Sequence, residues 1–285
     1  MNSCSIRHQI ENKISTGLLC VNYLASVGVV VINKLLFTIF DFHPITLTAI
    51  HLLVIVLLLQ LCRAKNVYVV KRIEFIQHLP LSMLFGAYVL FNNLSIYCNS
   101  LVTYQLAKTL ANLIIFAIED FYRDKFWTRS LILGHVLTTS GFIIYARFNV
   151  RISTVGYVTC IIGSMLAAGY RIAIASLLVL CPLILFSELT RQSRVIVSWQ
   201  SILLVLLSGF CAFGINFSSY IFTTRMKPIS YILLSTFKFI TVIVIGIILS
   251  DYLFWSPMLI GIAISIVGVL CYIPNYIYLT SPTLK

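Results

Sequence analysis

Long apolar runs recur along this chain and constrain its fold more than any motif. Of its 285 residues, 60% are hydrophobic and 10% are charged. A run of about 18 apolar residues can cross a bilayer, and in lipid it must be helical because every backbone N–H and C=O needs a partner. The sequence therefore predicts an all-α integral membrane protein. The expected spans are 17–39, 45–62, 79–98, 101–118, 130–146, 154–171, 172–188, 195–216, 229–250 and 256–274.

The first span is expected to remain as an anchor. Residues 1–16 are polar, and the apolar run that follows is too long for a signal-peptide core and has no small-residue cleavage site. Prolines near several predicted helix starts support those boundaries, since proline is favoured at the first turn of a helix. These prolines are Pro44, Pro80, Pro228 and Pro257.

One region leaves the number of spans open. Residues 154–187 are apolar except for Arg171, and two spans would ordinarily need about 40 residues. Either two short helices meet in a tight turn near Arg171, or one long tilted helix crosses once. Our prediction of ten spans takes the first alternative.

Basic residues predict the orientation. The formal net charge is +12, and most of the Lys and Arg flank the spans, so the charge indicates cytosolic loops rather than nucleic-acid binding. With the N-terminus in the cytosol and ten spans, most loop cations face the cytosol. We expect a multi-pass protein with both termini cytosolic, including an N-tail at 1–16 and a C-tail at 275–285.

Four cations lie inside the predicted spans without a carboxylate beside them: Lys34, Lys108, Arg171 and Lys238. A charge in the bilayer is costly and usually faces the bundle interior, where it has a partner. All eight acids fall at span ends or in loops: Glu11, Asp41, Glu74, Glu119, Asp120, Asp124, Glu188 and Asp251. The missing negative charge is then expected to be the cargo, which predicts an anion transporter.

Two of the cations have a tyrosine on the same helical face. Tyr104 and Lys108 are four residues apart, and Tyr231 and Lys238 are seven apart. An ammonium can bind a phosphate, while the phenol can offer a hydrogen bond or a ring face to a base or sugar. These four residues are the main candidates for substrate binding.

The other two cations have competing interpretations. Lys34 can help to bind the anion, or it can extend to the interface, because it lies about a turn and a half from the end of its span. Arg171 can help as well, or it can sit at a helix end or turn.

Other residues in the spans predict packing. Asn92 and Asn93 lie mid-way along the third span and are expected to form interhelical hydrogen bonds. Glycines at helical spacing indicate close helix contacts; they are Gly156, Gly163, Gly261 and Gly268.

Several function classes lack support. The chain has no glycine-rich phosphate loop, no HExxH and no nucleophile–base grouping, so we expect neither an enzyme nor a cofactor. The eight cysteines show no metal-type spacing, and a disulfide framework is not expected. The absence of a carboxylate in the spans argues against proton-coupled export.

These residues also carry a family resemblance. The stretch Phe91–Lys125, with NNLS, YQLAKT and FYRDK in that order, resembles the third-to-fifth-helix region of the solute carrier 35 family. That family is the nucleotide-sugar and triose-phosphate translocator branch of the drug/metabolite transporter superfamily. Further similar stretches are INKLLF followed by FHPITLTAIH, the pair Tyr170-Arg171, KPISYILLSTFK and GIILSDYLFWSP. The chain looks closest to the E subgroup.

The resemblance implies ten helices in two inverted five-helix repeats, 17–146 and 154–274, with the first two helices of the second repeat shortened. The site would lie at the repeat interface near the midplane, where the fourth and ninth helices are equivalents. It also implies an antiporter of the Golgi or another endomembrane. The expected partners are a nucleotide sugar or sugar phosphate, its counter-substrate, membrane lipid and, in a homodimer, a second copy.

Departures from the family pattern keep alternatives open. Phe239 stands where triose-phosphate translocators have an arginine after the ninth-helix lysine, which disfavours a sugar monophosphate. Family members that transport pentose or hexose nucleotides often have a threonine at this position, and that residue is missing too. The polar loop after the sixth helix is missing. The chain can therefore also be a divergent, non-transporting scaffold or partner of the same fold, a sugar-phosphate transporter, or an anion channel.

Overall fold

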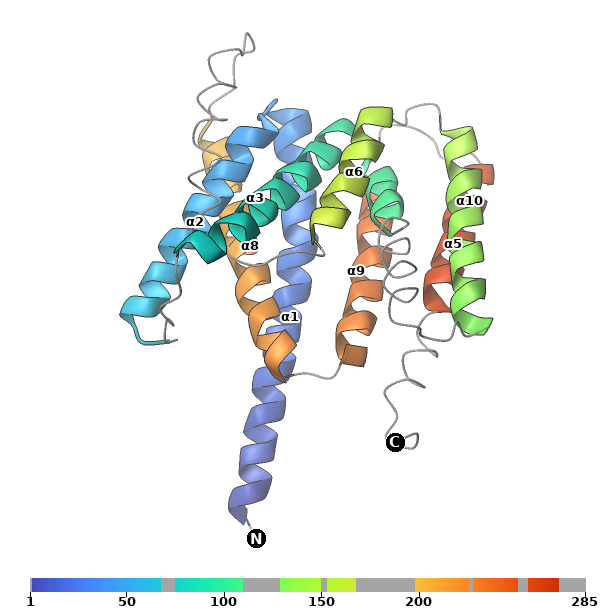
Figure 1. Ribbon diagram of the computed structural model, residues 1–285. Coiled ribbons are helices and arrows are strands. Elements are labelled where there is room, and N and C mark those ends of the chain that lie inside the picture. Colours follow the sequence, from blue (N-terminus) through green and yellow to red (C-terminus); the bar gives the residue numbers. More distant parts are fainter. Residues whose placement is uncertain are drawn as a thin grey trace.

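The computed structural model describes residues 2–67, 75–109, 129–149, 153–167, 198–225, 228–250 and 256–271. Every regular element in these ranges is a helix (Figure 1). The helices are α1 (Asn2–Ile39), α2 (Pro44–Ala64), α3 (Phe75–Cys98), a helical stretch over 101–109, α5 (Arg129–Phe148), α6 (Thr154–Ala167), α8 (Trp199–Arg225), α9 (Pro228–Ile248) and α10 (Ser256–Leu270).

The described helices agree closely with the predicted spans. Among the described residues, three segments are long and apolar enough to cross a bilayer: Gly17–Ile39 within α1, Pro44–Ala64, and Trp199–Ser219 within α8. Shorter apolar segments within α3, α5, α9 and α10 overlap other predicted spans. The predicted seventh span, 172–188, lies outside the described residues, so the count of ten helices stays a prediction.

Helix α1 is longer than its membrane span. It begins at Asn2, so the polar N-terminal segment continues the same helix as the apolar run. Figure 1 shows this part of α1 extending beyond the ends of the other helices.

Backbone geometry ends α1 and α2 sharply. After α1, Asp41 takes a left-handed conformation with φ of 47°, and the Phe42 N–H bonds back to the Leu36 carbonyl at 3.1 Å. After α2, Asn66 has φ of 54°. There the N–H groups of Asn66 and Val67 satisfy carbonyls of the last turn, which is the pattern of a Schellman cap with asparagine at the left-handed position.

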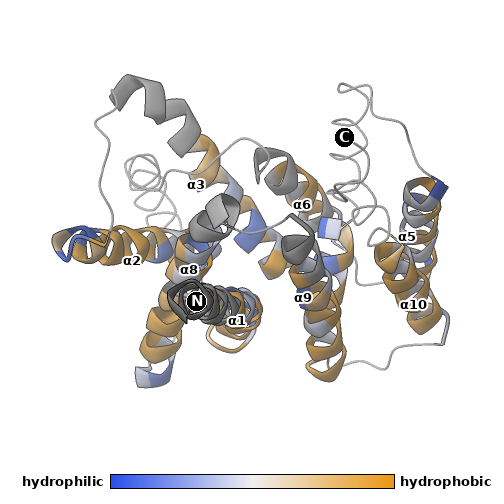
Figure 2. Cartoon of the chain, turned by 90° about the horizontal axis from the view of Figure 1, so that it is seen from below, coloured by the Kyte–Doolittle hydropathy of each residue, from blue (hydrophilic) through white to orange (hydrophobic). Residues whose placement is uncertain are grey.

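Close approach of glycines joins α5 to α10. A Cβ on Gly261 would lie 2.6 Å from the Tyr145 nitrogen, and a Cβ on Gly268 would lie 2.5 Å from the Thr138 nitrogen. These two predicted contacts are confirmed, as is that of Gly156, whose Cβ would meet the Asn99 side chain at 2.0 Å. The surroundings of Gly163 lie outside the described residues. Figure 2 shows α5 and α10 side by side at one edge of the molecule.

A buried polar network connects α1, α2, α3 and α8. The Asn33 amide donates to Asn93 Oδ1 at 2.9 Å, and the Asn93 amide donates to Thr48 Oγ1 at 2.8 Å. Ser208 of α8 donates to Asn33 Oδ1. All four side chains are buried. The predicted interhelical hydrogen bond of Asn93 is thereby confirmed, and it ties α8 to three helices of the N-terminal half.

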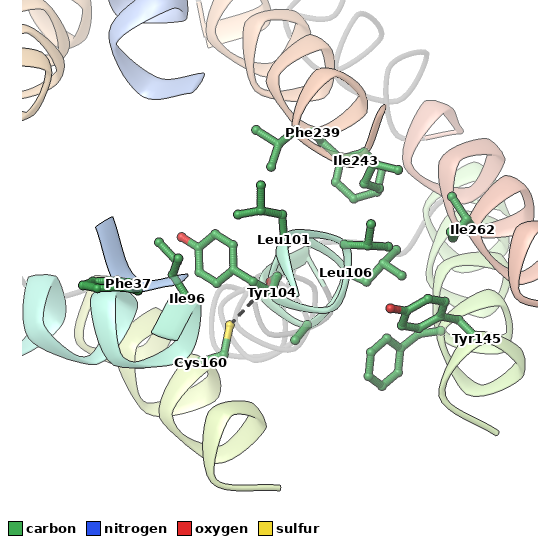
Figure 3. Close-up of a cluster of buried hydrophobic side chains, with 14 of the residues drawn as sticks. Phe37, Ile96, Leu101, Tyr104, Leu106, Tyr145, Cys160, Phe239, Ile243 and Ile262 are labelled. Atoms are coloured by element: carbon green, nitrogen blue, oxygen red, sulfur yellow. Dashed lines mark hydrogen bonds between the residues drawn. The ribbon is translucent and has the colours of Figure 1, made fainter. Parts of the chain in front are cut away.

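The stretch 101–109 lies within the largest apolar cluster (Figure 3). Ser100 caps its start, because the Ser100 hydroxyl accepts from the Thr103 N–H at 3.2 Å. Leu101 faces Phe239 of α9, whereas the Tyr104 ring points toward Ile96 of α3. This stretch therefore separates α9 from α3 and α6 and presents a different face to each.

Candidate functional site

Lys108 and Lys238 belong to helices that touch through a glycine. A Cβ on Gly246 of α9 would lie 3.0 Å from both Leu101 Cβ and Val102 Cγ2. Lys238 stands about two turns before Gly246, and Lys108 about two turns after Leu101. Because the two segments run in opposite directions (Figure 1), both lysines reach the same level. The two positive charges lie within electrostatic range and repel each other.

Lys108 is held by the tyrosine that the sequence paired with it. Its ammonium donates to Tyr104 Oη at 3.0 Å and lies 5.3 Å from the centre of the same ring. The Tyr104 hydroxyl donates in turn to Asn92 Oδ1 at 3.2 Å. Asn92 therefore forms its predicted interhelical bond, and it does so with the partner of Lys108. The expected pairing of Tyr104 and Lys108 on one helical face is confirmed.

Lys238 has a hydrogen-bond partner that the sequence did not predict. Its ammonium donates to Oδ1 of Asn22 in α1. The Asn22 amide nitrogen donates to Ser218 Oγ at 2.7 Å and to Ser219 Oγ at 3.1 Å, both on α8. The available signal was that Asn22 is one of two asparagines within the first apolar run, since a buried amide must find partners.

Lys34 binds a helix end. Its ammonium donates to the carbonyls of Asn99 at 2.7 Å and Ile96 at 3.1 Å, which belong to the unsatisfied last turn of α3. In these contacts Lys34 is directed to the end of α3 and not to the other two lysines. The Asn99 side chain also accepts from the Ser153 N–H at 3.2 Å, so the end of α3 joins α1 to the start of α6.

Other residues near the candidate lysines, and two further candidates, have different surroundings. Thr103 turns away from Lys108 and shares its hydroxyl with Tyr145 of α5 at 2.8 Å. Phe239 is buried in the apolar cluster. Tyr231 lies in α9, but its side chain lies outside the described part of the structure, as does all of Arg171.

The partners of the three described cations share one property. Among the described residues, Lys34, Lys108 and Lys238 donate to uncharged oxygens: two backbone carbonyls, a phenol and an amide. The phenol and the amide satisfy hydrogen bonds without cancelling the charge, whereas the carbonyls at a helix end offset part of it. A site with two neighbouring ammonium groups and neutral acceptors can bind a multiply charged anion such as a diphosphate, since hydrogen bonds between ions are about twice as strong as neutral ones.

Comparison with known proteins gives sequence and fold relatives. Residues 161–273 match the Triose-phosphate Transporter family. The chain is 25% identical to UDP-xylose transporter 2 of Arabidopsis thaliana, over 90% of this chain and 80% of that protein. It is 23% identical to UDP-rhamnose/UDP-galactose transporter 1 of the same plant, over 90% of this chain and 82% of that protein.

A solved crystal structure has the same fold. Its TM-score is 0.61 at 15% identity, over 94% of this chain and 99% of that chain. This similarity shows the fold alone. The sequence matches support the nucleotide-sugar and triose-phosphate transporter superfamily, and the matched relatives are transporters rather than enzymes. The E subgroup stays a prediction.

Proposed function

We propose that this chain is an antiporter that exchanges a nucleotide sugar for a second phosphate-bearing metabolite across the Golgi or another endomembrane, with both termini cytosolic. The observation that carries the proposal is that Lys108 and Lys238 stand at the same level of two touching helices, each held by a neutral oxygen. Two ammonium groups that repel each other are costly in a membrane protein, and a phosphate-bearing ligand would remove that cost.

The packing of the described helices supports the proposed inverted repeats. The most extensive contacts pair α1 with α8, α3 with α6 and α5 with α10. In two five-helix repeats, the first helix corresponds to the sixth, the third to the eighth and the fifth to the tenth. If each helix is replaced by its counterpart in the other repeat, the α1–α8 contact becomes the α6–α3 contact. The α5–α10 contact is its own counterpart. Such a pattern favours a binding site between the repeats.

The proposed site divides its roles among the candidate residues. Lys108 and Lys238 bind the phosphates, and Tyr104 and Tyr231 contact neighbouring groups of the ligand. Arg171 helps from the end of the sixth span. Lys34 helps indirectly, since its contacts hold the end of α3.

A UDP-sugar is the substrate class that the relatives favour, since those compared are UDP-xylose and UDP-rhamnose/UDP-galactose transporters. The burial of Phe239 disfavours a small sugar phosphate, although Phe239 also departs from the threonine common in nucleotide-sugar transporters. At that position a side chain directed into the apolar cluster adds no further charge for a small sugar phosphate, so the ligand must gain affinity elsewhere, for example through its base.

The test is exchange in proteoliposomes with labelled UDP-xylose, UDP-galactose, UDP-rhamnose and triose phosphate. We expect the purified protein to exchange at least one UDP-sugar, and Lys108→Ala and Lys238→Ala each to abolish uptake at unchanged protein yield. Lys65→Ala is the matched control, because Lys65 is exposed at the end of α2. Normal uptake by either site variant would remove that lysine from the proposed site.

A non-transporting scaffold of the same fold is the competing proposal, motivated by the shortened 154–187 region. Thermal unfolding separates the two, because a ligand that binds the native state raises its stability. A transporter gains thermal stability with its UDP-sugar, whereas a scaffold shows no shift with any of the four compounds. An anion channel would also bind the ligand, but its uptake of labelled ligand would not require unlabelled ligand inside the liposomes.

A further inference from the structure

Asn22 holds Lys238 in an arrangement that fixes the direction of its amide. The side chain is fully buried in α1. Its nitrogen is directed to α8, where it donates to Ser218 Oγ and Ser219 Oγ and, at 3.4 Å, to the Ile215 carbonyl. Its oxygen is therefore left for the Lys238 ammonium. A flipped amide would set two donors against each other, so the contacts select one orientation.

The choice of an amide at this place has an electrostatic consequence. Aspartate has nearly the same shape as asparagine and would form an ion pair with Lys238, as buried cations commonly require. The amide satisfies one hydrogen bond of the ammonium without supplying a negative charge, and in the described part of the chain no carboxylate bonds to Lys238. The charge of Lys108 is likewise not balanced by its described partner, which is the neutral hydroxyl of Tyr104.

We propose that Asn22 is a positioning residue that keeps the Lys238 charge uncompensated, and that this makes the return of the empty transporter dependent on a bound anion. The inference rests on the proposed antiport. When ligand is bound, its phosphate oxygens replace or join Asn22 Oδ1 at the ammonium. When ligand is absent, the uncompensated like charges of Lys108 and Lys238 oppose passage through the closed state, and exchange prevails over net transport.

A purely structural role for Asn22 predicts something different. If the amide served only to join α1 to α8 and α9, Asn22→Asp would break its donation to both serines and lower the thermal stability. In our proposal the serine hydroxyls rotate and donate to the carboxylate instead, and the new ion pair offsets the lost bonds. Asn22→Asp would then supply a resident counter-ion, weaken binding of the anion and relieve the dependence of return on ligand.

The experiment measures labelled UDP-sugar uptake into proteoliposomes that are empty or preloaded with the same unlabelled compound, using the panel member that wild-type exchanges best. For wild-type we expect preloading to stimulate uptake at least about tenfold. For Asn22→Asp we expect this ratio to fall close to one and KM to rise about tenfold, which corresponds to about 1.4 kcal/mol of lost binding. Ligand-free thermal stability should be retained. Ser218→Ala is the matched control; it removes one α8 bond, leaves the Lys238 acceptor neutral and should keep the wild-type dependence on preloading.

The outcomes separate the two proposals. A wild-type protein that exchanges none of the UDP-sugars overturns the proposed function and this inference with it. A wild-type protein that exchanges, together with a folded Asn22→Asp variant of unchanged ratio and KM, overturns the inference alone. If Asn22→Asp does not fold, Ser219→Asp places a carboxylate in the same cluster, and a folded Ser219→Asp variant with wild-type dependence also overturns it.

Discussion

Replacing Lys34 by methionine removes the cation at the end of α3 while keeping much of the length and apolar volume of the side chain. The structure shows two bonds from its ammonium, at 2.7 and 3.1 Å, to carbonyls of the last turn. The substitution leaves those carbonyls unsatisfied unless other donors replace the lysine. It therefore distinguishes a residue that stabilises a helix end from one that binds substrate.

The magnitude follows from the two bonds. Hydrogen bonds to a charged group contribute about 1.5–3 kcal/mol each, and a cation at a helix C-terminus adds about 0.3–1 kcal/mol. Part of this is offset, because methionine does not carry the desolvation cost of a partly buried ammonium. We expect a net loss of about 1–3 kcal/mol, hence a fall in melting temperature of about 2–10 °C.

The assay combines thermal unfolding in detergent with transport kinetics. Lys34→Met should lower the melting temperature and the maximal exchange rate while leaving KM within about twofold, and Lys34→Arg should recover part of the stability. Lys65→Met is the control for loss of an exposed lysine and should change neither quantity. An unchanged melting temperature together with a KM raised tenfold would refute the helix-end role and place Lys34 in the substrate site.

Two further predictions concern packing. Gly261→Ala should destabilise the protein by about 1–3 kcal/mol, because its Cβ would lie 2.6 Å from the backbone of α5. Gly17→Ala is the control, because a Cβ on Gly17 would have nothing within 4 Å. Equal melting temperatures for the two variants would contradict this prediction. Asn93→Leu should cost about 1–2 kcal/mol, since interhelical hydrogen bonds in membranes contribute about 0.6 kcal/mol each and both Asn33 and Thr48 lose a partner. A melting temperature at or above that of wild-type would show that the network adds no stability.

The sequence could predict the helices because hydropathy and proline placement are local signals. Gly17–Ile39 matches its predicted span, and α2 begins at Pro44. The extension of α1 to Asn2 was missed, since hydropathy reports partition into lipid and not helicity. The polar N-terminal residues can continue a helix outside the membrane.

Most contacts of the cations could not be predicted from the sequence, because they depend on the tertiary structure. The pairing of Tyr104 with Lys108 could be predicted because four residues of helix separate them. The Lys34 contacts could not, because the carbonyls of Ile96 and Asn99 become available only where α3 ends beside α1. Asn22 reaches Lys238 across 216 residues of chain, and no spacing rule links them.

The chemical nature of each acceptor then assigns a role to each described cation. Lys34 meets the end of a helix, whose carbonyls together carry roughly half a negative charge, so its own charge is partly neutralised within the protein. Lys108 and Lys238 meet a phenol and an amide, which carry no net charge. The electrostatic cost of the first cation is therefore reduced by the fold, whereas in the proposed site that of the other two is reduced by the bound anion. The same reasoning explains why a carboxylate at position 22 would act against the proposed function: it would give Lys238 the neutralisation that Lys34 already has, and the ligand would have less to contribute.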